Sequence, residues 1–223
     1  MAQGIDKRRF ARYDLRLPVL YKRLGSGRGK AGVGWTRNLS MGGVCLDLDE
    51  RLEPKTVLGV LFQTERGAIE VEAVVVWTAS VPGLDGGTTH GLEFTQLGPR
   101  QAQAMERLLG DLRPTARSGH RLTLDIGVAV TPGDRPGEVI SGRTGNASRG
   151  GALLLLPQAL NSGTPVTVRL QTSREPLRLD AVVVWVDPPE KRQPGEAIRH
   201  GVQFVSLDWS TSLALGLLLT GAA

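Results

Sequence analysis

Two segments of the chain alternate between apolar and polar residues, which is the pattern of a β-strand with one buried face. In 68–77, the alternate positions predicted to share the inward face are Ile69, Val71, Ala73, Val75 and Trp77. In 176–185, the corresponding positions are Leu177, Leu179, Ala181, Val183 and Trp185. The chain is therefore predicted to contain the same strand twice, and each copy ends in a tryptophan.

Shorter apolar runs surround both segments and are separated by turns rich in glycine and proline, at the close spacing of a small antiparallel barrel. The additional strands predicted in the first half are 15–22, 43–48, 57–63 and 90–95. Those predicted in the second half are 122–130, 151–156, 165–171 and 200–205. The fold class predicted from this pattern is mainly β.

Helical periodicity appears only towards the end of each half. In 99–112, the apolar residues that recur on one helix face are Met105, Leu108, Leu109 and Leu112. This spacing predicts a short amphipathic helix. The leucine-rich tail 208–220 is predicted to be the equivalent helix. Its apolar run is shorter than the roughly 18 residues that a membrane-spanning helix requires, so we expect no membrane insertion.

The similarity between the halves extends to short motifs. The hexapeptide Asn-Leu-Ser-Met-Gly-Gly at 38–43 recurs as Asn-Ala-Ser-Arg-Gly-Gly at 146–151, and in each copy a tryptophan follows the asparagine by 39 residues. The shared offset of 108 to 110 residues is too long for a solenoid repeat, so each copy is predicted to be a whole domain. We place the first domain at 1–111, a linker at 112–119 and the second domain at 120–223.

The composition is that of a globular protein. With 223 residues, 40% of them hydrophobic, the chain has enough apolar surface for two modest cores. Its first residues lack the apolar core of a signal peptide, so we expect a cytoplasmic location. The single cysteine, Cys45, is predicted to be a buried strand residue. His90 and His200 begin equivalent strands without further metal ligands nearby, which favours structural hydrogen bonds over metal coordination.

Positive charge is concentrated at the start of the chain. Residues 1–37 hold ten Lys or Arg against two Asp, a net charge of +8, whereas 38–111 hold five basic and eleven acidic residues, a net charge of −6. Arginines outnumber lysines 22 to 5, and the planar guanidinium suits bidentate contacts to phosphate and to a guanine edge. Codon bias would produce the same arginine content, so composition leaves both explanations open.

The repeated Asn-x-Ser-x-Gly-Gly motif places a carboxamide, a hydroxyl and two glycines within six residues. Such a segment lets polar groups and the backbone approach a phosphate or a base edge closely. The same residue types also form ordinary tight turns, and gene duplication copies a turn as faithfully as a binding loop. The motif by itself therefore leaves both interpretations open.

Upstream of the first motif, Arg8 and Arg12 are separated by three residues, and 25 residues lie between Arg12 and Asn38. This combination resembles the PilZ domain family, whose pattern is Arg-x-x-x-Arg, a gap of some twenty to thirty residues, and Asp/Asn-x-Ser-x-x-Gly. The resemblance covers about 1–110 and includes the strands that end in Trp77 and Phe94. It implies a small six-stranded antiparallel barrel with a short C-terminal helix, present here twice in tandem.

PilZ domains bind the bacterial second messenger cyclic di-GMP, and the resemblance implies the same ligand here, with no cofactor and no metal. The ligand-binding residues that it implies in the first domain are Arg8, Arg9, Arg12, Asn38, Ser40, Gly42 and Gly43. The chemistry agrees, because a dianionic ligand with two guanine edges requires bidentate arginines and amide donors.

The second domain keeps the spacing of the motif but has fewer basic residues around it. Its candidate ligand-binding residues are Arg117, Arg121, Asn146, Ser148 and Gly151. The basic cluster that flanks the first arginine pair is missing, and Ser118 and Gly119 stand where the first domain has an apolar and aromatic surrounding. The sequence leaves open whether this domain binds ligand or is a structural or partner-docking domain.

The resemblance implies a receptor or adaptor that changes conformation on binding cyclic di-GMP and so regulates a protein partner. We expect the arm at 6–13 to fold over the barrel near 38–43 when ligand binds. Two alternatives remain: a ligand-independent interaction adaptor, and a nucleic-acid-binding protein that uses the basic arm for phosphates. An enzyme is not expected, because the sequence contains no recognisable acid–base, nucleophile or metal constellation.

Overall fold

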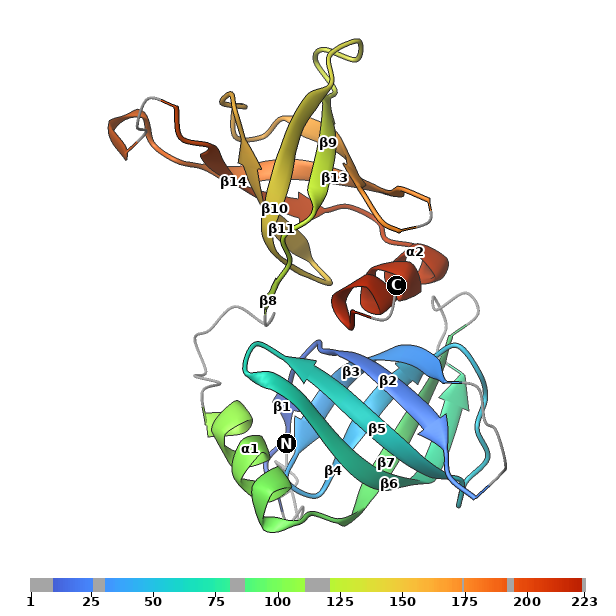
Figure 1. Cartoon of the computed structure of the whole chain (residues 1–223). Coiled ribbons are helices and arrows are strands. Elements are labelled where there is room, and N and C mark those ends of the chain that lie inside the picture. Colours follow the sequence, from blue (N-terminus) through green and yellow to red (C-terminus); the bar gives the residue numbers. More distant parts are fainter. Residues whose placement is uncertain are drawn as a thin grey trace, which may run out of the picture. The chain divides into compact units, whose positions relative to one another are not determined.

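The computed structural model describes residues 10–25, 31–80, 87–110, 121–173, 175–191 and 195–221. These residues form two compact units, which are described separately (Figure 1). The predicted linker at 112–119 lies outside the described residues, as do the site candidates Arg8, Arg9 and Arg117.

The first unit is a closed antiparallel β-barrel. Its six long strands follow the order β3-β2-β5-β6-β7-β4, and β4 pairs again with β3, which closes the ring, while the short β1 extends β3 at one edge. Its elements are β1 (Tyr13–Asp14), β2 (Pro18–Arg23), β3 (Gly32–Ser40), β4 (Gly43–Leu48), β5 (Val57–Thr64), β6 (Gly67–Ser80), β7 (Thr88–Gln96) and α1 (Pro99–Gly110). Closure pairs every long strand on both sides.

The second unit repeats this topology. The ring has the order β11-β14-β13-β12-β9-β10 and closes where β10 pairs with β11, and β8 extends β10. Its elements are β8 (Leu122–Thr123), β9 (Gly127–Pro132), β10 (Ile140–Ser148), β11 (Gly151–Leu156), β12 (Pro165–Leu170), β13 (Leu177–Val186), the short 3-10 helix η1 (Pro189–Lys191), β14 (Ile198–Phe204) and α2 (Trp209–Leu219). The prediction of two six-stranded barrels in tandem, each followed by a short helix, is confirmed.

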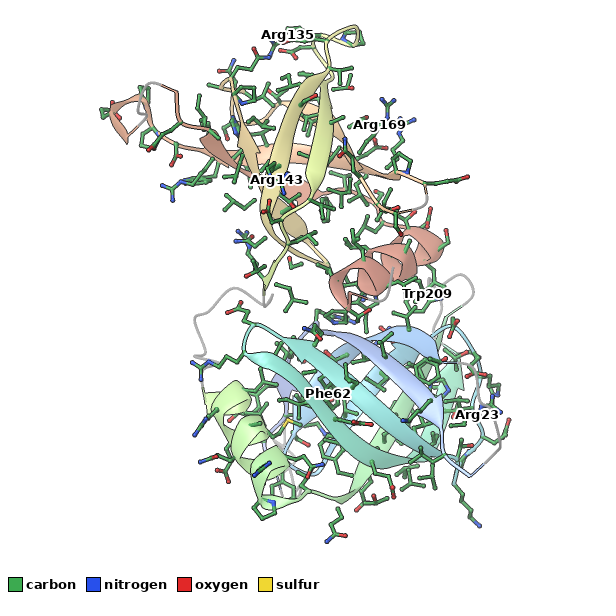
Figure 2. The ribbon with its side chains drawn as sticks, viewed as in Figure 1. Arg23, Phe62, Arg135, Arg143, Arg169 and Trp209 are labelled. Atoms are coloured by element: carbon green, nitrogen blue, oxygen red, sulfur yellow. The ribbon has the colours of Figure 1, made fainter. Side chains whose placement is uncertain are left out.

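The core of the first barrel uses the inward positions that the alternation predicts. The buried residues of β6 are Ile69, Val71, Ala73 and Val75. Phe62 of β5 and Phe94 of β7 meet edge to face in this core, with ring centroids 6.3 Å apart, and Figure 2 labels Phe62. Helix α1 contributes Met105, which is fully buried in the same cluster. Packing of α1 therefore follows from its amphipathic sequence.

Both helices lie within their predicted ranges. Helix α1 ends at Gly110, and Leu112 lies outside the described residues. Helix α2 begins after Asp208, whose side chain accepts a hydrogen bond from the Thr211 N–H at 2.7 Å, as an N-cap residue does. Within the described ranges, no helix has the length and apolar character needed to span a membrane.

The prediction that Trp77 and Trp185 share the inward face is wrong. The two residues are 41% and 43% exposed. A register shift between Val75 and Trp77, repeated between Val183 and Trp185, introduces one extra residue into each strand. Because side chains alternate with a period of two, this bulge turns each tryptophan to the outer face.

Two long strands, β3 and β10, lie outside the predicted strand ranges. Strand β3 ends at Ser40 and β4 begins at Gly43, so the repeated motif is the end of a hairpin rather than a separate loop. Strands β10 and β11 form the same hairpin in the second barrel. Both missed strands are rich in glycine and polar residues, and hydrophobic alternation therefore does not reveal them.

The equivalent histidines His90 and His200 are buried, and the predicted structural hydrogen bonds are confirmed. The Leu52 N–H donates to His90 Nε2 at 3.0 Å, and His90 Nδ1 lies 3.1 Å from the Thr88 carbonyl oxygen. These two partners require a neutral ring that carries its proton on Nδ1. His200 makes the equivalent pair of contacts. Among the described residues, no three His, Cys, Asp or Glu side chains are grouped as metal ligands.

Candidate functional site

Strand pairing in the first barrel aligns five residues in one row across the sheet. Trp77 of β6 is opposite Gly91 of β7, and Gly91 is opposite Cys45 of β4. Cys45 is in turn opposite Asn38 of β3, and Asn38 is opposite Asp14 of β1. Directly opposed residues point to the same face of a sheet, so these side chains share one face.

This row lies on the outer face of the barrel. Val44 and Leu46, on either side of Cys45, belong to the core, and side chains alternate along a strand. Cys45 therefore faces outward together with its partners Asn38 and Gly91. The equal spacing of asparagine and tryptophan in the two halves of the sequence thus has a structural basis, because both residues stand in one row.

The middle of the row is flat because its residues are small. A Cβ atom built on Gly91 would lie 2.0 Å from Trp77 Nε1, so the indole lies directly over the glycine. Cys45 is 6% exposed and confirms the prediction of a buried strand residue. Trp77 consequently covers Gly91 and offers a planar, partly exposed apolar surface in the row, next to the small side chain of Cys45.

Ser40 and Gly43 hold the hairpin beside this row. Ser40 Oγ donates to the Gly43 carbonyl oxygen at 3.1 Å and accepts the Gly42 N–H at 3.3 Å. A Cβ on Gly43 would lie 2.2 Å from the Leu92 carbonyl oxygen, so only glycine lets β4 and β7 approach this closely. The Asn38 carboxamide, in contrast, has no hydrogen bond to another residue in the described part of the chain.

The segment before β1 contacts the hairpin turn. A Cβ on Gly42 would lie 2.7 Å from Cδ2 of Phe10, so the phenyl ring covers this glycine. Arg12 directly precedes β1 and is exposed. Because β1 pairs with β3 at Asn38, the chain that carries Arg12 enters beside the row. Arg12 therefore lies two residues before the residue opposite Asn38, and its charge acts on Cys45 in the same row.

A polar network that sequence reasoning missed lies next to the row, around the buried carboxylate of Asp47. Arg37 Nε donates to Asp47 Oδ1 at 2.7 Å, and Arg16 Nη1 donates to Oδ2 at 3.0 Å. The Thr89 hydroxyl also donates to Oδ1, at 2.7 Å. The only sequence signal for this network is an acidic residue between two strand leucines, which is hard to separate from an ordinary surface position.

The charges of this network act on the centre of the row. Burial raises the pKa of the Cys45 thiol and Asp47 raises it further, whereas Arg37, Arg12 and Arg16 lower it. Three guanidinium groups are therefore close enough to influence the electrostatic potential at this thiol. Asp14, at the end of the row, and Asp47 are two carboxylates against these three arginines, so the charge on balance is positive and suits an anionic ligand.

The second barrel repeats the row. Trp185 of β13 is opposite Gly201 of β14, Gly201 is opposite Leu153 of β11, and Leu153 is opposite Asn146 of β10. Arg121 directly precedes β8, at the position that Arg12 has before β1. The candidate residues of the second barrel that the structure describes are therefore arranged in the same way as their equivalents in the first barrel.

The hairpin contacts are repeated as well. Ser148 Oγ donates to the Gly151 carbonyl oxygen at 3.3 Å, and a Cβ on Gly151 would lie 2.2 Å from the Val202 carbonyl oxygen. The turn residue Gly150 has no described atom within 4 Å of a Cβ position, whereas the equivalent glycine of the first barrel is covered by a phenyl ring. Asn146 Oδ1 is buried and accepts no hydrogen bond from the described residues.

The charged network is not repeated. The residues that stand in the second barrel at the positions of Asp47, Arg37 and Arg16 are Leu155, Gly145 and Asp125. Asp125 pairs with Arg143 at 2.6 Å. The second barrel therefore keeps the row of asparagine, glycine and tryptophan, but it replaces the two arginines and the buried carboxylate beside the row. The charged groups that stand there instead, Asp125 and Arg143, pair with each other.

The chain is similar to several solved structures and to one family model. Nothing matches among the curated proteins. Among solved structures, the PilZ domain of YcgR from Escherichia coli, with c-di-GMP, is similar at 15% identity over 48% of this chain and 92% of that chain, with a TM-score of 0.42. The inhibitor of motility MotI/DgrA from Bacillus subtilis is similar at 15% identity over 94% and 96% of the two chains, with a TM-score of 0.38.

PlzA from Borreliella burgdorferi, in complex with c-di-GMP, is similar at 14% identity over 94% of this chain and 88% of that chain, with a TM-score of 0.39. The family model described as the PilZ domain matches this chain twice, at residues 6–111 and 115–219. These two matches take in both barrels with their helices and both repeated motifs, and the chain therefore belongs to the PilZ domain family.

Proposed function

We propose that this chain is a receptor for cyclic di-GMP rather than an enzyme, and that its first barrel carries the principal site. Membership of the PilZ family supports the ligand. The observation that carries the proposal is the outward row in which Asn38 and Trp77 stand on either side of a flat floor, with Arg12 entering beside it. A planar, dianionic dinucleotide needs this combination of stacking surface, amide and guanidinium.

Each element of the site has a distinct role in this proposal. The Trp77 indole stacks on a guanine base, and the Asn38 carboxamide hydrogen-bonds to a base edge. Arg12, together with Arg8 and Arg9 of the arm, binds phosphate oxygens and the Hoogsteen edge of guanine. The serine and glycines of the hairpin hold the turn in the shape that presents the asparagine.

We propose that the second barrel binds the same ligand at least about tenfold more weakly, which corresponds to roughly 1.4 kcal/mol. It retains Arg121, Asn146 and Trp185 in equivalent places. Asp125 and Gly145, however, replace two arginines beside the row. A single charge-assisted hydrogen bond contributes about 1.5–3 kcal/mol, so the loss of one such bond is sufficient for this difference.

Isothermal titration calorimetry with cyclic di-GMP tests the receptor and the ranking of the two sites. Arg12→Ala and Arg121→Ala are matched variants, because each removes the arginine that directly precedes the first strand of its barrel. We expect Arg12→Ala to weaken the tighter binding about ten- to hundredfold and Arg121→Ala to leave it unchanged. If the wild type does not bind cyclic di-GMP, the proposal of a receptor is wrong. If both variants lose the same affinity, the proposal that the first barrel binds more tightly is wrong.

We further propose that ligand binding orders the arm at 6–13 against the hairpin and thereby changes the surface that a protein partner recognises. The closeness of Phe10, a residue of this arm, to Gly42 of the hairpin turn supports the proposal. Hydrogen-exchange mass spectrometry should show slower exchange across 6–16 and changed exchange across 110–121 when cyclic di-GMP is added. Identical exchange in both segments would exclude this mechanism.

A further inference from the structure

Arg37 occupies the extra position of a β-bulge in β3. Its two neighbours in the strand pair in register with β4, whereas Arg37 itself has no partner there. The bond from Arg37 Nε to Asp47 Oδ1 places its side chain on the outer side of the sheet, the side that Asn38 and Cys45 also face. The bulge therefore presents a guanidinium on the ligand face immediately beside the asparagine of the motif.

Asp47 fixes this guanidinium in place. Its carboxylate is fully buried and accepts from Arg37, Arg16 and Thr89. A buried carboxylate is stable only when donors surround it, and the donors are held in position in return. Arg16 is further fixed because its Nη1 also lies 3.4 Å from the Thr36 carbonyl oxygen. Arg37 therefore loses little conformational entropy when an anion binds.

The guanidinium of Arg37 retains donors for a ligand. It carries five N–H groups, and its Nε bond to Asp47 uses one of them. Its side chain remains 30% exposed, and that of Arg16 remains 37% exposed. The cluster of Arg37, Arg16 and Asp47 has a net positive charge. Its carboxylate is buried, so the arginines are the charged groups that remain at the surface.

We propose that Arg37 is a further ligand-contacting residue of the first barrel and that Asp47 is its positioning residue. Arg37 binds a phosphate oxygen or a guanine edge of the ligand at the Asn38 end of the row, while Nε stays on Asp47. The inference rests on the proposed function, because it concerns the same site. It adds to that function a specificity element that belongs to only one barrel.

The second barrel provides a natural contrast. Gly145 stands at the bulge position and Leu155 at the position of the buried carboxylate, so neither member of the pair is present there. The coupled absence agrees with a dependent pair, because a carboxylate without its arginines would be buried and unpaired. The presence of the Arg37–Asp47 pair in the first barrel alone is therefore a second reason, independent of the arm, to expect the tighter site there.

Titration calorimetry with cyclic di-GMP on the full chain tests the pair through a double-mutant cycle. We expect Arg37→Ala to weaken binding about ten- to hundredfold and Asp47→Asn to weaken it by a smaller factor. The double variant should bind no more weakly than Arg37→Ala, because Asp47 acts through Arg37. A general structural defect would instead add its loss to that of the arginine.

Arg23→Ala is the matched control. Arg23 is in the same barrel, at the opposite end of β2 from Arg16, and pairs with exposed Glu50 at 2.5 Å (Figure 2). Its loss removes the same charge as Arg37→Ala without touching the row, so we expect unchanged affinity. An equal loss in Arg23→Ala would mean that net charge, not Arg37, determines binding, and would overturn the inference.

The failure of this inference is distinct from the failure of the proposed function. If the wild type does not bind cyclic di-GMP, the proposed receptor function is wrong. If the wild type binds and Arg37→Ala binds equally well, only the role of Arg37 is wrong, and additive losses in the cycle overturn the role of Asp47. Should Asp47→Asn fail to fold, Arg37→Lys replaces it, because lysine keeps the charge but cannot hold the Nε bond, and unchanged affinity would overturn the positioned contact.

Discussion

At the scale of single residues, the glycines of the site differ in what surrounds them. A Cβ on Gly43 would lie 2.2 Å from the Leu92 carbonyl oxygen, which is part of a paired strand and cannot move aside. A Cβ on Gly91 would lie 2.0 Å from Trp77 Nε1, which belongs to a side chain that can rotate. The first glycine is therefore required by the barrel, and the second is required by the position of the tryptophan.

This difference predicts that alanine at one glycine mainly affects stability and that alanine at the other mainly affects ligand binding. Gly43→Ala should lower the free energy of unfolding by about 1–3 kcal/mol, as overpacking does, measured by urea denaturation. Gly91→Ala should have a smaller effect on stability but should displace Trp77 and weaken cyclic di-GMP binding, measured by calorimetry. Gly201→Ala is the control, since its Cβ would lie at an ordinary 3.4 Å from the tryptophan ring of the second barrel. Unchanged ligand affinity in Gly91→Ala would contradict a stacking role for Trp77.

His90 makes the stability of the first barrel depend on pH. Burial lowers its pKa below the ordinary value of 6.5, and a proton on Nε2 would remove the acceptor of the Leu52 N–H. The unfolded chain therefore takes up this proton at a higher pH than the folded chain. Stability from this group is complete above about pH 6.5 and falls as the pH drops towards the lowered pKa.

Urea denaturation at about pH 7.5 and about pH 5.5 measures this dependence. We expect a lower free energy of unfolding at the acidic pH and a smaller difference in His90→Gln, which cannot titrate in this range. The comparison between wild type and variant removes the contribution of carboxylates that both share. An equal pH dependence in the two proteins would show that His90 is not the titrating group.

At the scale of elements, the sequence predicted the strands whose stability comes from apolar side chains. Alternation identified β6 and β13 and their inward residues as far as Val75 and Val183, but it failed at the next residue on that face. A bulge is set by the register of the partner strand, so the sequence of one strand does not contain it. The exposed tryptophans and the bulge residue Arg37 became apparent only from cross-strand pairing.

The site was predictable to the same extent. The resemblance to the PilZ signature joined Arg12 and Asn38 in one motif, and in the structure Arg12 lies two residues before Asp14, the residue opposite Asn38. The roles of Asp47 and Arg37 were not predicted. Arg37 reaches Asp47 because of the bulge, and Asp47 is a buried charged residue, which is uncommon in protein interiors. The hairpin role of Ser40 likewise required its partners to be seen.

Strand β3 escaped prediction because its polar residues bond to other elements. Thr36 is buried, its Oγ1 accepts the Leu17 N–H at 2.8 Å, and the hydroxyl donates to the Leu15 carbonyl oxygen. In the second barrel, Thr144 makes the equivalent pair of bonds. These threonines attach the segment before the first long strand of each barrel to the strand that carries the asparagine motif.

Thr36→Val is therefore expected to lower the free energy of unfolding by about 1–3 kcal/mol, because a buried N–H is left without an acceptor. The urea midpoint measures this loss. Thr36→Ser keeps the hydroxyl and should be closer to wild type, which separates hydrogen bonding from packing. If Thr36→Ser were as destabilised as Thr36→Val, the methyl group rather than the hydroxyl would be the stabilising part.

At the scale of the whole molecule, two barrels of one topology carry the same row with different charges beside it. The first barrel surrounds the row with Arg12, Arg16 and Arg37, whereas the second has Asp125 and Gly145 in place of the last two. Duplication therefore preserved the stacking and amide groups while the electrostatic environment diverged. We therefore expect the two proposed sites to respond to ligand over two concentration ranges.

Differential scanning calorimetry of the full chain tests this inequality. We expect two transitions, because each barrel closes on itself, and the transition lowered by Thr36→Val identifies the first barrel while that lowered by Thr144→Val identifies the second. A ligand stabilises the state that it binds by about 2.7 kcal/mol at a concentration one hundred times its Kd. At that concentration a site that binds tenfold more weakly is stabilised by only about 1.4 kcal/mol, so cyclic di-GMP should raise the first-barrel transition more than the second at every concentration. Equal shifts of both transitions at every concentration would mean that the lost arginines do not determine affinity.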